Sequence, residues 1–189
     1  MGAEGRRFTM AQANLNTREY WDSRWLAGGT LSRKCEKVLM KLVTEDHVSV
    51  LDIGCGSGRI LRGLRKDKKC DVFGIDISPV AITKLSHQGI PGVVGRAEEL
   101  HTLQKKFDVV ICSHTLEHID DDAKLVRDIA EKAFKYAIFA VPNNAMGPEE
   151  CPDHVRKYTT EGLTALLSKY FKRVEDHSTG IHLILKAYA

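Results

Sequence analysis

The chain has 189 residues and a formal net charge of +3, from 28 Lys and Arg against 25 Asp and Glu. Hydrophobic residues make up 43% and charged residues 28%, an ordinary globular composition that excludes disordered, collagen-like and low-complexity classes. This length suits one core, so we predict a single domain over 1–189, and the small basic excess makes nucleic acid an unlikely partner.

The cysteines indicate a reducing compartment. The chain has five of them, an odd number without a C-x-x-C pair, which argues against a disulfide framework and against a zinc ribbon. No apolar stretch approaches the ~18 residues that a membrane-spanning helix needs. We therefore expect a cytoplasmic protein without a membrane contact.

The N-terminal part divides into a polar segment and two helices. Residues 1–14 have no apolar period, and we predict that they are flexible. Tyr20, Trp21 and Trp25 fall at helical spacing in a helix predicted over 17–26, and a second helical pattern covers 32–42. We expect Trp25 to be a core residue, whereas Tyr20 and Trp21 are open to a role at a ligand.

From residue 48 onward, short apolar runs alternate with helical patterns. The runs predict strands over 48–53, 71–75, 92–95, 107–112 and 136–141. The helical patterns cover 58–64, 80–87, 121–133 and 160–170. This alternation predicts a Rossmann-like α/β/α sandwich with a mostly parallel sheet. Two last runs, 173–177 and 181–188, flank Ser-Thr-Gly, so we expect the seven-stranded sheet to end in an antiparallel hairpin.

A glycine turn after the first predicted strand is the strongest local signal. The sequence VLDIGCGSG places Gly54, Gly56 and Gly58 at every second position behind Asp52. Glycine allows backbone to approach a ligand closely and to adopt positive φ. Arg59 stands where a dinucleotide fingerprint needs glycine, and no G-K-[ST] follows, so nicotinamide and P-loop sites are disfavoured.

A second acid completes this constellation. Asp76 ends the second predicted strand, where a carboxylate can accept hydrogen bonds from both hydroxyls of a ribose. Asp52 lies under the glycine turn, where it either holds the loop amides or faces an amine-bearing ligand. A lone glycine turn is weak evidence, but strand, acid, turn, helix and second acid together indicate a nucleoside-binding site.

These residues resemble the class I S-adenosylmethionine-dependent methyltransferases, in particular the small enzymes of the ubiquinone-biosynthesis type. The resemblance covers 48–189 and depends on VLDIGCGSG, GIDIS, GRAEEL, FDVVICSHTLEHI, AIFAVPN and HVRKYT. It implies S-adenosylmethionine as cofactor and an N-terminal helical cover over 15–45. The implied cofactor-binding residues are Asp52, Gly54, Cys55, Gly56, Gly58, Asp76, Ile77, Ala97, Glu98, Ser113 and His114. Arg96 departs from the family, which often has Asp there to accept from the adenine amino group.

A polar cluster, Ser113 to His118, follows the fourth predicted strand and has three interpretations. In the first, His114 packs at the cofactor and Glu117 anchors the turn. In the second, His118 or His114 is a general base, because imidazole titrates near neutral pH. In the third, His114, Glu117, His118 and His154 hold a divalent ion, in an arrangement comparable to that of small-RNA 3′-terminal 2′-O-methyltransferases. Our prediction includes no metal.

The segment 142–158 is longer than an ordinary connection, and we predict a lid-like substrate loop. In the resembled family, the positions of His154 and Tyr158 look toward the substrate, so both join His118 and His114 as candidate catalytic residues. The alternative is a solvated loop with one buried tyrosine.

The expected activity is direct displacement of the cofactor's methyl group onto a small-molecule acceptor. Three alternatives stay open. The first is metal-assisted 2′-O-methylation of RNA, and the second is S-adenosylmethionine binding without catalysis. The third is a nicotinamide-dependent oxidoreductase, which Arg59 disfavours.

Overall fold

A computed structural model describes residues 15–28, 33–143 and 146–189, so the predicted flexible segment 1–14 lies outside the described residues. The helices are α1 (Arg18–Leu26), α2 (Arg33–Leu42), α3 (Arg59–Lys68), α4 (Pro79–Ser86), α5 (Asp122–Lys132) and α6 (Thr160–Leu167). Two 3₁₀ turns cover Ala97–Thr102 and Leu116–His118. The strands are β1 (Ser49–Ile53), β2 (Asp71–Asp76), β3 (Gly92–Val94), β4 (Phe107–Ser113), β5 (Ala133–Pro142), β6 (Arg173–Asp176) and β7 (His182–Tyr188).

The seven strands form one sheet in the order β3-β2-β1-β4-β5-β7-β6. The first five are parallel to their neighbours, whereas β7 runs antiparallel to both β5 and β6. The prediction of a Rossmann-like sandwich with a C-terminal antiparallel pair is confirmed. The strand order reverses between β1 and β4, and ligands of such sheets bind at the carboxyl ends of the strands beside this point.

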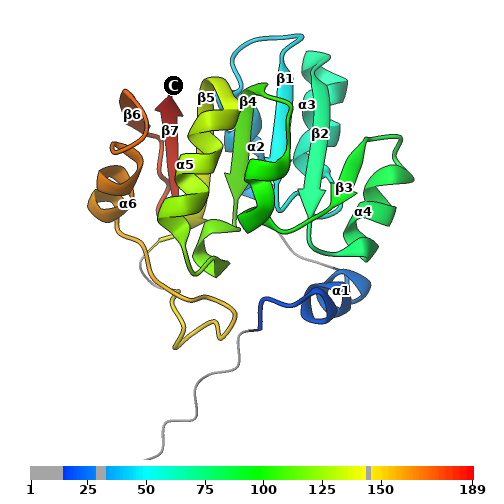
Figure 1. Cartoon of the computed structure of the whole chain (residues 1–189), viewed down its shortest axis with the longest axis horizontal. Coiled ribbons are helices and arrows are strands. Elements are labelled where there is room, and N and C mark those ends of the chain that lie inside the picture. The colour runs from blue at the N-terminus through cyan, green and yellow to red at the C-terminus, as the bar shows by residue number, and fades with distance from the viewer. Residues whose placement is uncertain (1–14, 29–32, 144–145) are drawn as a thin grey trace, which may run out of the picture.

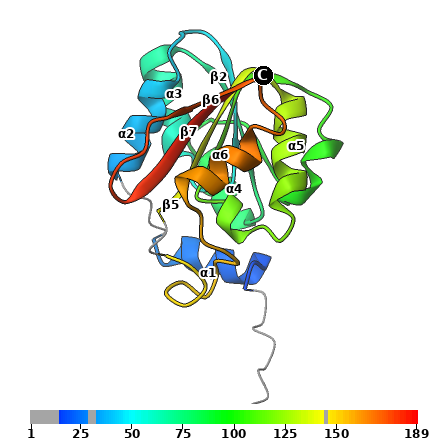
Figure 2. The ribbon, with the colours of Figure 1, turned by 90° about the vertical axis from the view of Figure 1, so that its left-hand side faces the viewer.

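Helices cover both faces of the sheet and form two cores (Figures 1 and 2). On one face, Leu39 of α2 and Leu61 of α3 pack with Val50 and Ile111. On the other face, α5 and α6 pack against the alternate residues of the same strands. A strand that is covered on both sides is apolar at nearly every position, which explains why the central strands read as continuous apolar runs.

The helix starts follow the expected capping chemistry. The side chains of Thr17, Ser78, Asp121 and Thr159 each accept a hydrogen bond from a backbone N–H in the first turn of their helix. The end of α5 differs from the prediction, because Ala133 already pairs with Phe107 in the sheet. The side chains at 134 and 135 are exposed, so the apolar run that predicts β5 begins only after them and misses the start of the strand.

Among the helices that the structure describes, α1 alone lies across the carboxyl edge of the sheet, next to the segment that follows β5 (Figures 1 and 2). The Asp22 carboxylate accepts hydrogen bonds from the Ser78 hydroxyl and the Val80 N–H, which attaches α1 to the start of α4. By contrast, α2 packs on a face of the sheet, where Leu39 is fully buried. The helical cover predicted over 15–45 is therefore limited, among the described residues, to α1.

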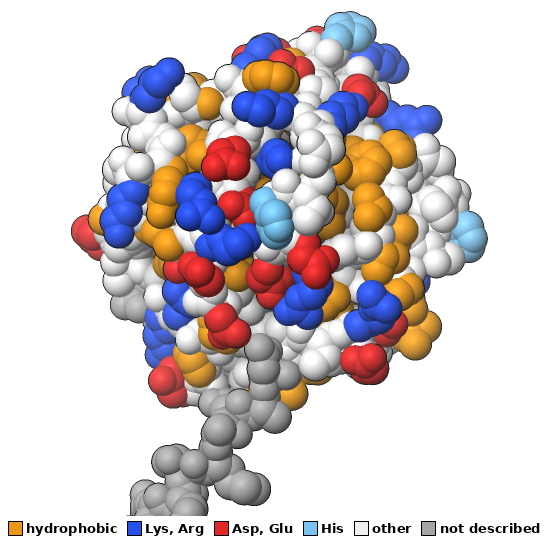
Figure 3. Space-filling view, in the orientation of Figure 1, with side chains coloured by type: hydrophobic (Ala, Val, Ile, Leu, Met, Phe, Trp, Pro, Cys, Tyr) orange, Lys and Arg blue, Asp and Glu red, His pale blue; other side chains and the backbone are white. Residues whose placement is uncertain are grey.

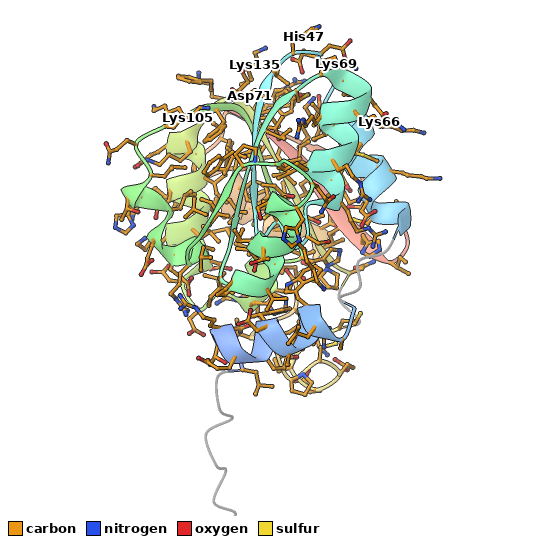
Figure 4. All side chains as sticks on the ribbon, turned by 90° about the vertical axis from the view of Figure 1, so that its right-hand side faces the viewer. His47, Lys66, Lys69, Asp71, Lys105 and Lys135 are labelled. Atoms are coloured by element: carbon orange, nitrogen blue, oxygen red, sulfur yellow. The ribbon has the colours of Figure 1, made fainter. Side chains whose placement is uncertain are left out.

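The basic end of α3 lies far from this edge, and charges of both signs are mixed on the face drawn in Figure 3. Lys66 and Lys69, from the basic end of α3, lie at the opposite end of the molecule from α1, together with Asp71 and Lys105 (Figure 4). Lys and Arg are interspersed with Asp and Glu on the face drawn in Figure 3. No helix within the described ranges has the length and apolar character needed to cross a membrane.

Candidate active site

A cavity of about 510 Å³ opens at the carboxyl edge of the sheet, between α1 and the loop after β5. Its volume falls within the range of about 300 to 1,000 Å³ that is typical of small-molecule sites. Nine of the residues predicted from the sequence line it: Gly54, Asp76, Ile77, Ala97, Glu98, Ser113, His114, His118 and His154. Asp52, Cys55, Gly56, Gly58 and Tyr158 are not among the lining residues.

The glycine turn joins β1 to α3 with three residues at positive φ. Gly54, Gly56 and Gly58 have φ of 69°, 52° and 76°. A Cβ at Gly58 would lie 2.1 Å from a methyl group of Leu85, so this glycine allows α4 to pack closely. The Cys55 thiol points toward Gly74 of β2, away from the pocket, and burial raises its pKa well above the ordinary value. Cys55 can therefore contact a ligand only through its backbone.

Trp25 lies at the pocket and not in the hydrophobic core as predicted. Its indole packs directly on Gly56, where a Cβ would lie 2.2 Å from the ring, and it is a half-buried residue that lines the pocket. The prediction of Trp25 as a core residue is wrong, because α1 turns this face toward the glycine turn and not toward the hydrophobic core. The backbone carbonyl of Trp25 also accepts a hydrogen bond from Lys84 of α4.

The Asp76 carboxylate fixes the turn. One oxygen accepts the Gly56 N–H at 2.8 Å and the other accepts the Ser78 N–H at 2.9 Å. Burial raises the pKa of Asp76, while these two backbone bonds oppose that effect. Each carboxylate oxygen has a second lone pair, so Asp76 can still accept from a ligand in the pocket.

Asp52 is buried beneath the same turn. Its pKa is raised well above the ordinary value, first by burial and then by the charge of Asp76. Its Oδ1 has no hydrogen-bond partner among the described residues, and the same is true of Ser113 Oγ at the end of β4. Buried polar atoms without partners are costly, so both atoms favour the arrival of a polar ligand.

The segment after β3 forms another wall of the pocket. Ala97 and Glu98 begin a 3₁₀ turn, and the Glu98 carboxylate pairs with the Arg96 guanidinium at 2.7 Å. Arg96 also lines the pocket, together with Ile77 from the end of β2. The backbone and apolar surface of this wall suit a flat ring, whereas Arg96 supplies only donors.

His114 is held beside a buried carboxylate. The residue has φ of 51°, and its Nδ1 lies 3.2 Å from Glu117 Oε1. Burial lowers the pKa of His114, but the neighbouring Cys35 and Glu117 side chains outweigh burial and raise it to about 10. This shift favours a ring that keeps its proton beside Glu117, so His114 is a poorer base than a neutral imidazole.

His118 and His154 line the pocket next to one another, with their rings packed edge-to-face and the centroids 4.9 Å apart. Nδ1 of His118 donates to the Asp153 carbonyl at 2.8 Å, and Nδ1 of His154 donates to the Met146 carbonyl at 2.9 Å. Because a carbonyl can only accept, Nδ1 carries a proton in each ring, and Nε2 is the atom that could accept one. The two histidines therefore have the geometry of proton acceptors.

A comparison with protein families identifies the domain. A model described as a methyltransferase domain matches residues 28–177, which is most of the chain. The chain belongs to the methyltransferase domain family. The resemblance to class I S-adenosylmethionine-dependent methyltransferases that the sequence motifs indicated is thereby confirmed.

Two relatives of the chain carry the names of methyltransferases. The chain is 38% identical over 86 residues to a ubiquinone biosynthesis O-methyltransferase of Pseudomonas aeruginosa, a match that covers 41% of this chain and 36% of that protein. It is 28% identical over 135 residues to the mitochondrial ubiquinone biosynthesis O-methyltransferase of Schizosaccharomyces pombe, covering 63% and 48%. These matches span less than half the length of the relatives.

The fold of this chain is similar to that of a solved methyltransferase structure. Magnesium protoporphyrin IX methyltransferase from Synechocystis PCC 6803, crystallised with S-adenosylhomocysteine, has a TM-score of 0.72 with this chain. The two are 17% identical, and the comparison covers 90% of this chain and 97% of the other. At this identity the likeness establishes the methyltransferase fold alone.

Tyr158 does not line the pocket of this methyltransferase domain. Its ring is buried, and its hydroxyl donates to Asp122 at 2.7 Å and approaches the Leu116 carbonyl at 3.5 Å. Burial and the neighbouring Asp122 raise its pKa above the ordinary value. These contacts support the alternative of one buried tyrosine, which holds the loop against the start of α5.

We expect Tyr158→Phe to destabilise the fold without affecting the site. The change removes a hydroxyl bonded to a carboxylate, so the free energy of unfolding should fall by about 1 to 3 kcal/mol. Denaturant unfolding measures this loss. Cofactor affinity and turnover should stay close to wild type under native conditions, and a loss of turnover in fully folded protein would return Tyr158 to the catalytic candidates.

Asn16 and His182 are two of the pocket residues that the sequence analysis did not predict. The Asn16 amide donates to the carbonyls of His118 and Asp153, at 2.9 and 3.1 Å, and so joins the start of the chain to both walls of the pocket. No local pattern predicts these contacts across more than 100 residues. His182 could have been found, because an antiparallel last strand begins at the edge where the parallel strands end.

Proposed function

We propose that this domain transfers a methyl group from S-adenosylmethionine to a small-molecule acceptor by direct displacement. The observation that supports the proposal is the position of the Asp76 carboxylate and the Gly54 turn in the same cavity as His118 and His154. A nucleoside subsite and a proton-accepting subsite thus share one enclosure. The matching family model gives this reaction class its support.

The residues of the pocket fit this cofactor. Asp76 keeps lone pairs for the ribose hydroxyls, and Ile77 and Ala97 offer a surface for the adenine ring. The unpartnered Oδ1 of Asp52 lies beneath the turn, where a cationic amino group would balance its charge. Ser113 Oγ, also buried without a partner among described atoms, would gain one.

When bound, the cofactor supplies a methyl group activated by a sulfonium, which needs an aligned nucleophile and little further catalysis. The protein aligns the acceptor and limits water, because α1 forms one wall of the cavity and Trp21 packs edge-to-face on His118 with the centroids 4.9 Å apart. His118 Nε2 or His154 Nε2 accepts the proton of an attacking hydroxyl or amine. His114 holds its proton beside Glu117 and serves as a wall of the site.

The acceptor is proposed to be a small hydroxylated molecule. Relatives that match over 86 and 135 residues carry the name of O-methyltransferases of ubiquinone biosynthesis. The net charge of +3 and the mixed surface charges offer little attraction to a phosphate backbone. Hydroxylated aromatic compounds are therefore the first acceptors to screen.

Calorimetry with S-adenosylmethionine and S-adenosylhomocysteine tests the cofactor, with NAD as the control. Micromolar binding of both sulfur nucleotides and no heat with NAD is expected. Binding of NAD alone would overturn the proposal in favour of an oxidoreductase. Tight binding of the sulfur nucleotides without methyl transfer to any acceptor would instead support a non-catalytic binding protein.

Replacing His118 with alanine should lower turnover more than cofactor affinity. A positioned base contributes about 100-fold or more to rate, so we expect a loss of that order, with less than roughly threefold change in the dissociation constant of S-adenosylhomocysteine. His87→Ala, at an exposed position after α4, is the matched control and should be neutral. Equal losses in turnover and affinity would make His118 a wall of the cofactor subsite.

One observation favours metal-assisted 2′-O-methylation of RNA as a second candidate. Glu117, His118 and His154 each offer a ligand atom within 4.8 Å of the others, and all three are buried. Two imidazoles and a carboxylate suit several divalent ions. Activity on RNA that a chelator abolishes would support this candidate, and activity that survives the chelator would exclude it.

A further inference from the structure

A second group of potential metal ligands meets at the side of the pocket near α2. Cys35 comes from α2, His114 follows β4, and His182 begins β7. One ligand atom from each lies within 4.8 Å of the other two. Cys35 is 2% exposed and His182 is 8% exposed, so the topology brings three distant parts of the chain together in the interior.

Three of the four imidazole nitrogens in this group make no hydrogen bond to the described residues. Among the described residues, Nε2 of His114 and both ring nitrogens of His182 are buried without a hydrogen bond. The two rings pack edge-to-face with centroids 5.0 Å apart. Buried polar atoms are satisfied in the great majority of proteins, so three unpartnered nitrogens in one place point to a missing ligand.

Glu117 orients one of these rings. Its Oε1 lies 3.2 Å from Nδ1 of His114, and Glu117 is 1% exposed. In metal sites, a histidine ligand commonly donates its other N–H to a carboxylate, which fixes the ring and directs the free nitrogen toward the ion. The bond between Glu117 and His114 keeps a proton on Nδ1, so an ion that binds this ring would displace only the proton of Nε2.

The three side chains define the class of ion. A thiolate and two imidazoles are donors for zinc and other thiophilic transition metals, whereas magnesium and calcium require oxygen ligands. We propose that Cys35, His114 and His182 bind a thiophilic divalent metal ion, for which Zn²⁺ is the best match.

The geometry leaves one coordination position toward the pocket. A tetrahedral zinc ion with bonds of about 2.0 to 2.3 Å holds its ligand atoms roughly 3.5 Å apart, so shifts of about an ångström would close the cluster. Both histidines line the cavity, whereas Cys35 lies behind them. Water or a heteroatom of a molecule in the pocket can take the fourth position, and binding of the ion does not depend on the proposed methyl transfer.

Titration of the metal-free full-length chain with Co²⁺ tests the site. Cobalt bound by a thiolate gives a sulfur-to-metal charge-transfer band in the near ultraviolet. We expect one equivalent of Co²⁺ to produce this band and Zn²⁺ to abolish it. This readout needs neither the cofactor nor an acceptor, so its outcome is separate from that of the methyl-transfer assay.

Matched variants identify the ligands. Cys35→Ser should abolish the band, and His182→Gln should weaken Co²⁺ binding at least tenfold. Cys151→Ser is the control, because Cys151 belongs to another potential cluster, with Asp153 and His154, and should keep the band. Circular dichroism of the metal-free variants checks that each is folded.

Two results would overturn the proposal. One is wild-type protein that binds neither Co²⁺ nor Zn²⁺, or binds Co²⁺ without a thiolate band, as an ion at Glu117, His118 and His154 would. The other is a band that persists in folded Cys35→Ser. Because the wild-type spectrum alone reports on thiolate ligation, a variant that fails to fold does not prevent a decision.

Discussion

Asp76→Ala is expected to weaken the binding of S-adenosylmethionine by about 1 to 3 kcal/mol, or roughly 5- to 150-fold. The carboxylate accepts the Gly56 and Ser78 N–H groups at 2.8 and 2.9 Å and faces the pocket. Alanine removes the acceptor proposed for the ribose and also leaves two buried backbone donors without their partner. Calorimetry of the variant with S-adenosylhomocysteine measures the loss.

Two further variants separate these contributions. Asp76→Asn keeps the shape but replaces one accepting oxygen with an NH₂ group, which cannot accept the Gly56 or Ser78 N–H, so it should also bind weakly. Asp71→Ala is the control, because Asp71 begins the same strand at the far end of the molecule with a largely exposed side chain (Figure 4). Unchanged affinity in folded Asp76→Ala would remove this residue from the site.

The part of the site that follows single strands could be predicted from the sequence. Asp76 and Ser113 each end a strand whose apolar run is easily recognised, and parallel strands bring such ends to one edge. The strand order and the pocket position then follow from the βαβ rule and the glycine turn. These features depend on short-range patterns and on one handedness rule.

The remaining part depends on packing between distant segments. Asn16 reaches the His118 and Asp153 carbonyls, and Trp25 packs on Gly56, because α1 is attached to α4 through Asp22. Nothing in the local sequence of α1 encodes this docking, so the periodicity suggested only that Trp25 would be buried. The ends of α5 and β5 were misplaced for a similar reason, since pairing of Ala133 with Phe107 overrides the helical pattern.

The histidines show the limit of reasoning from motifs. The pattern SHTLEH places His114 and His118 at the same edge but does not distinguish their roles. The structure distinguishes their contacts. Nδ1 of His114 lies 3.2 Å from the Glu117 carboxylate, whereas Nδ1 of His118 donates to the Asp153 carbonyl at 2.8 Å and has the Asp153 carboxylate farther away, at 3.8 Å. A carboxylate in direct contact favours the protonated form of His114, whereas the carbonyl fixes which ring nitrogen of His118 carries a proton.

Gly54→Ala is expected to lower both stability and cofactor affinity. Gly54 has φ of 69°, which costs a residue with a Cβ about 1 to 2 kcal/mol. The new Cβ would also lie 2.0 Å from Thr115 Oγ1, whose hydroxyl donates to the Ile53 carbonyl at 3.1 Å and cannot turn away freely. Overpacking of this kind adds about 1 to 3 kcal/mol. Because Gly54 lines the pocket, S-adenosylhomocysteine should bind at least ~10-fold more weakly, in keeping with such energies.

A double variant separates the two causes of this loss. Gly54→Ala with Thr115→Ala removes the overlapping hydroxyl. The loss of unfolding free energy that overpacking causes should then be recovered, whereas the loss caused by the positive φ should remain. Gly180→Ala is the matched control, because Gly180 is not at positive φ and a Cβ there would meet no described atom within 4 Å. If Gly54→Ala matched Gly180→Ala in stability and affinity, the turn would not require glycine there. Recovery of stability without recovery of affinity would instead assign Gly54 to close contact with the cofactor, since the methyl group itself would then be the obstacle.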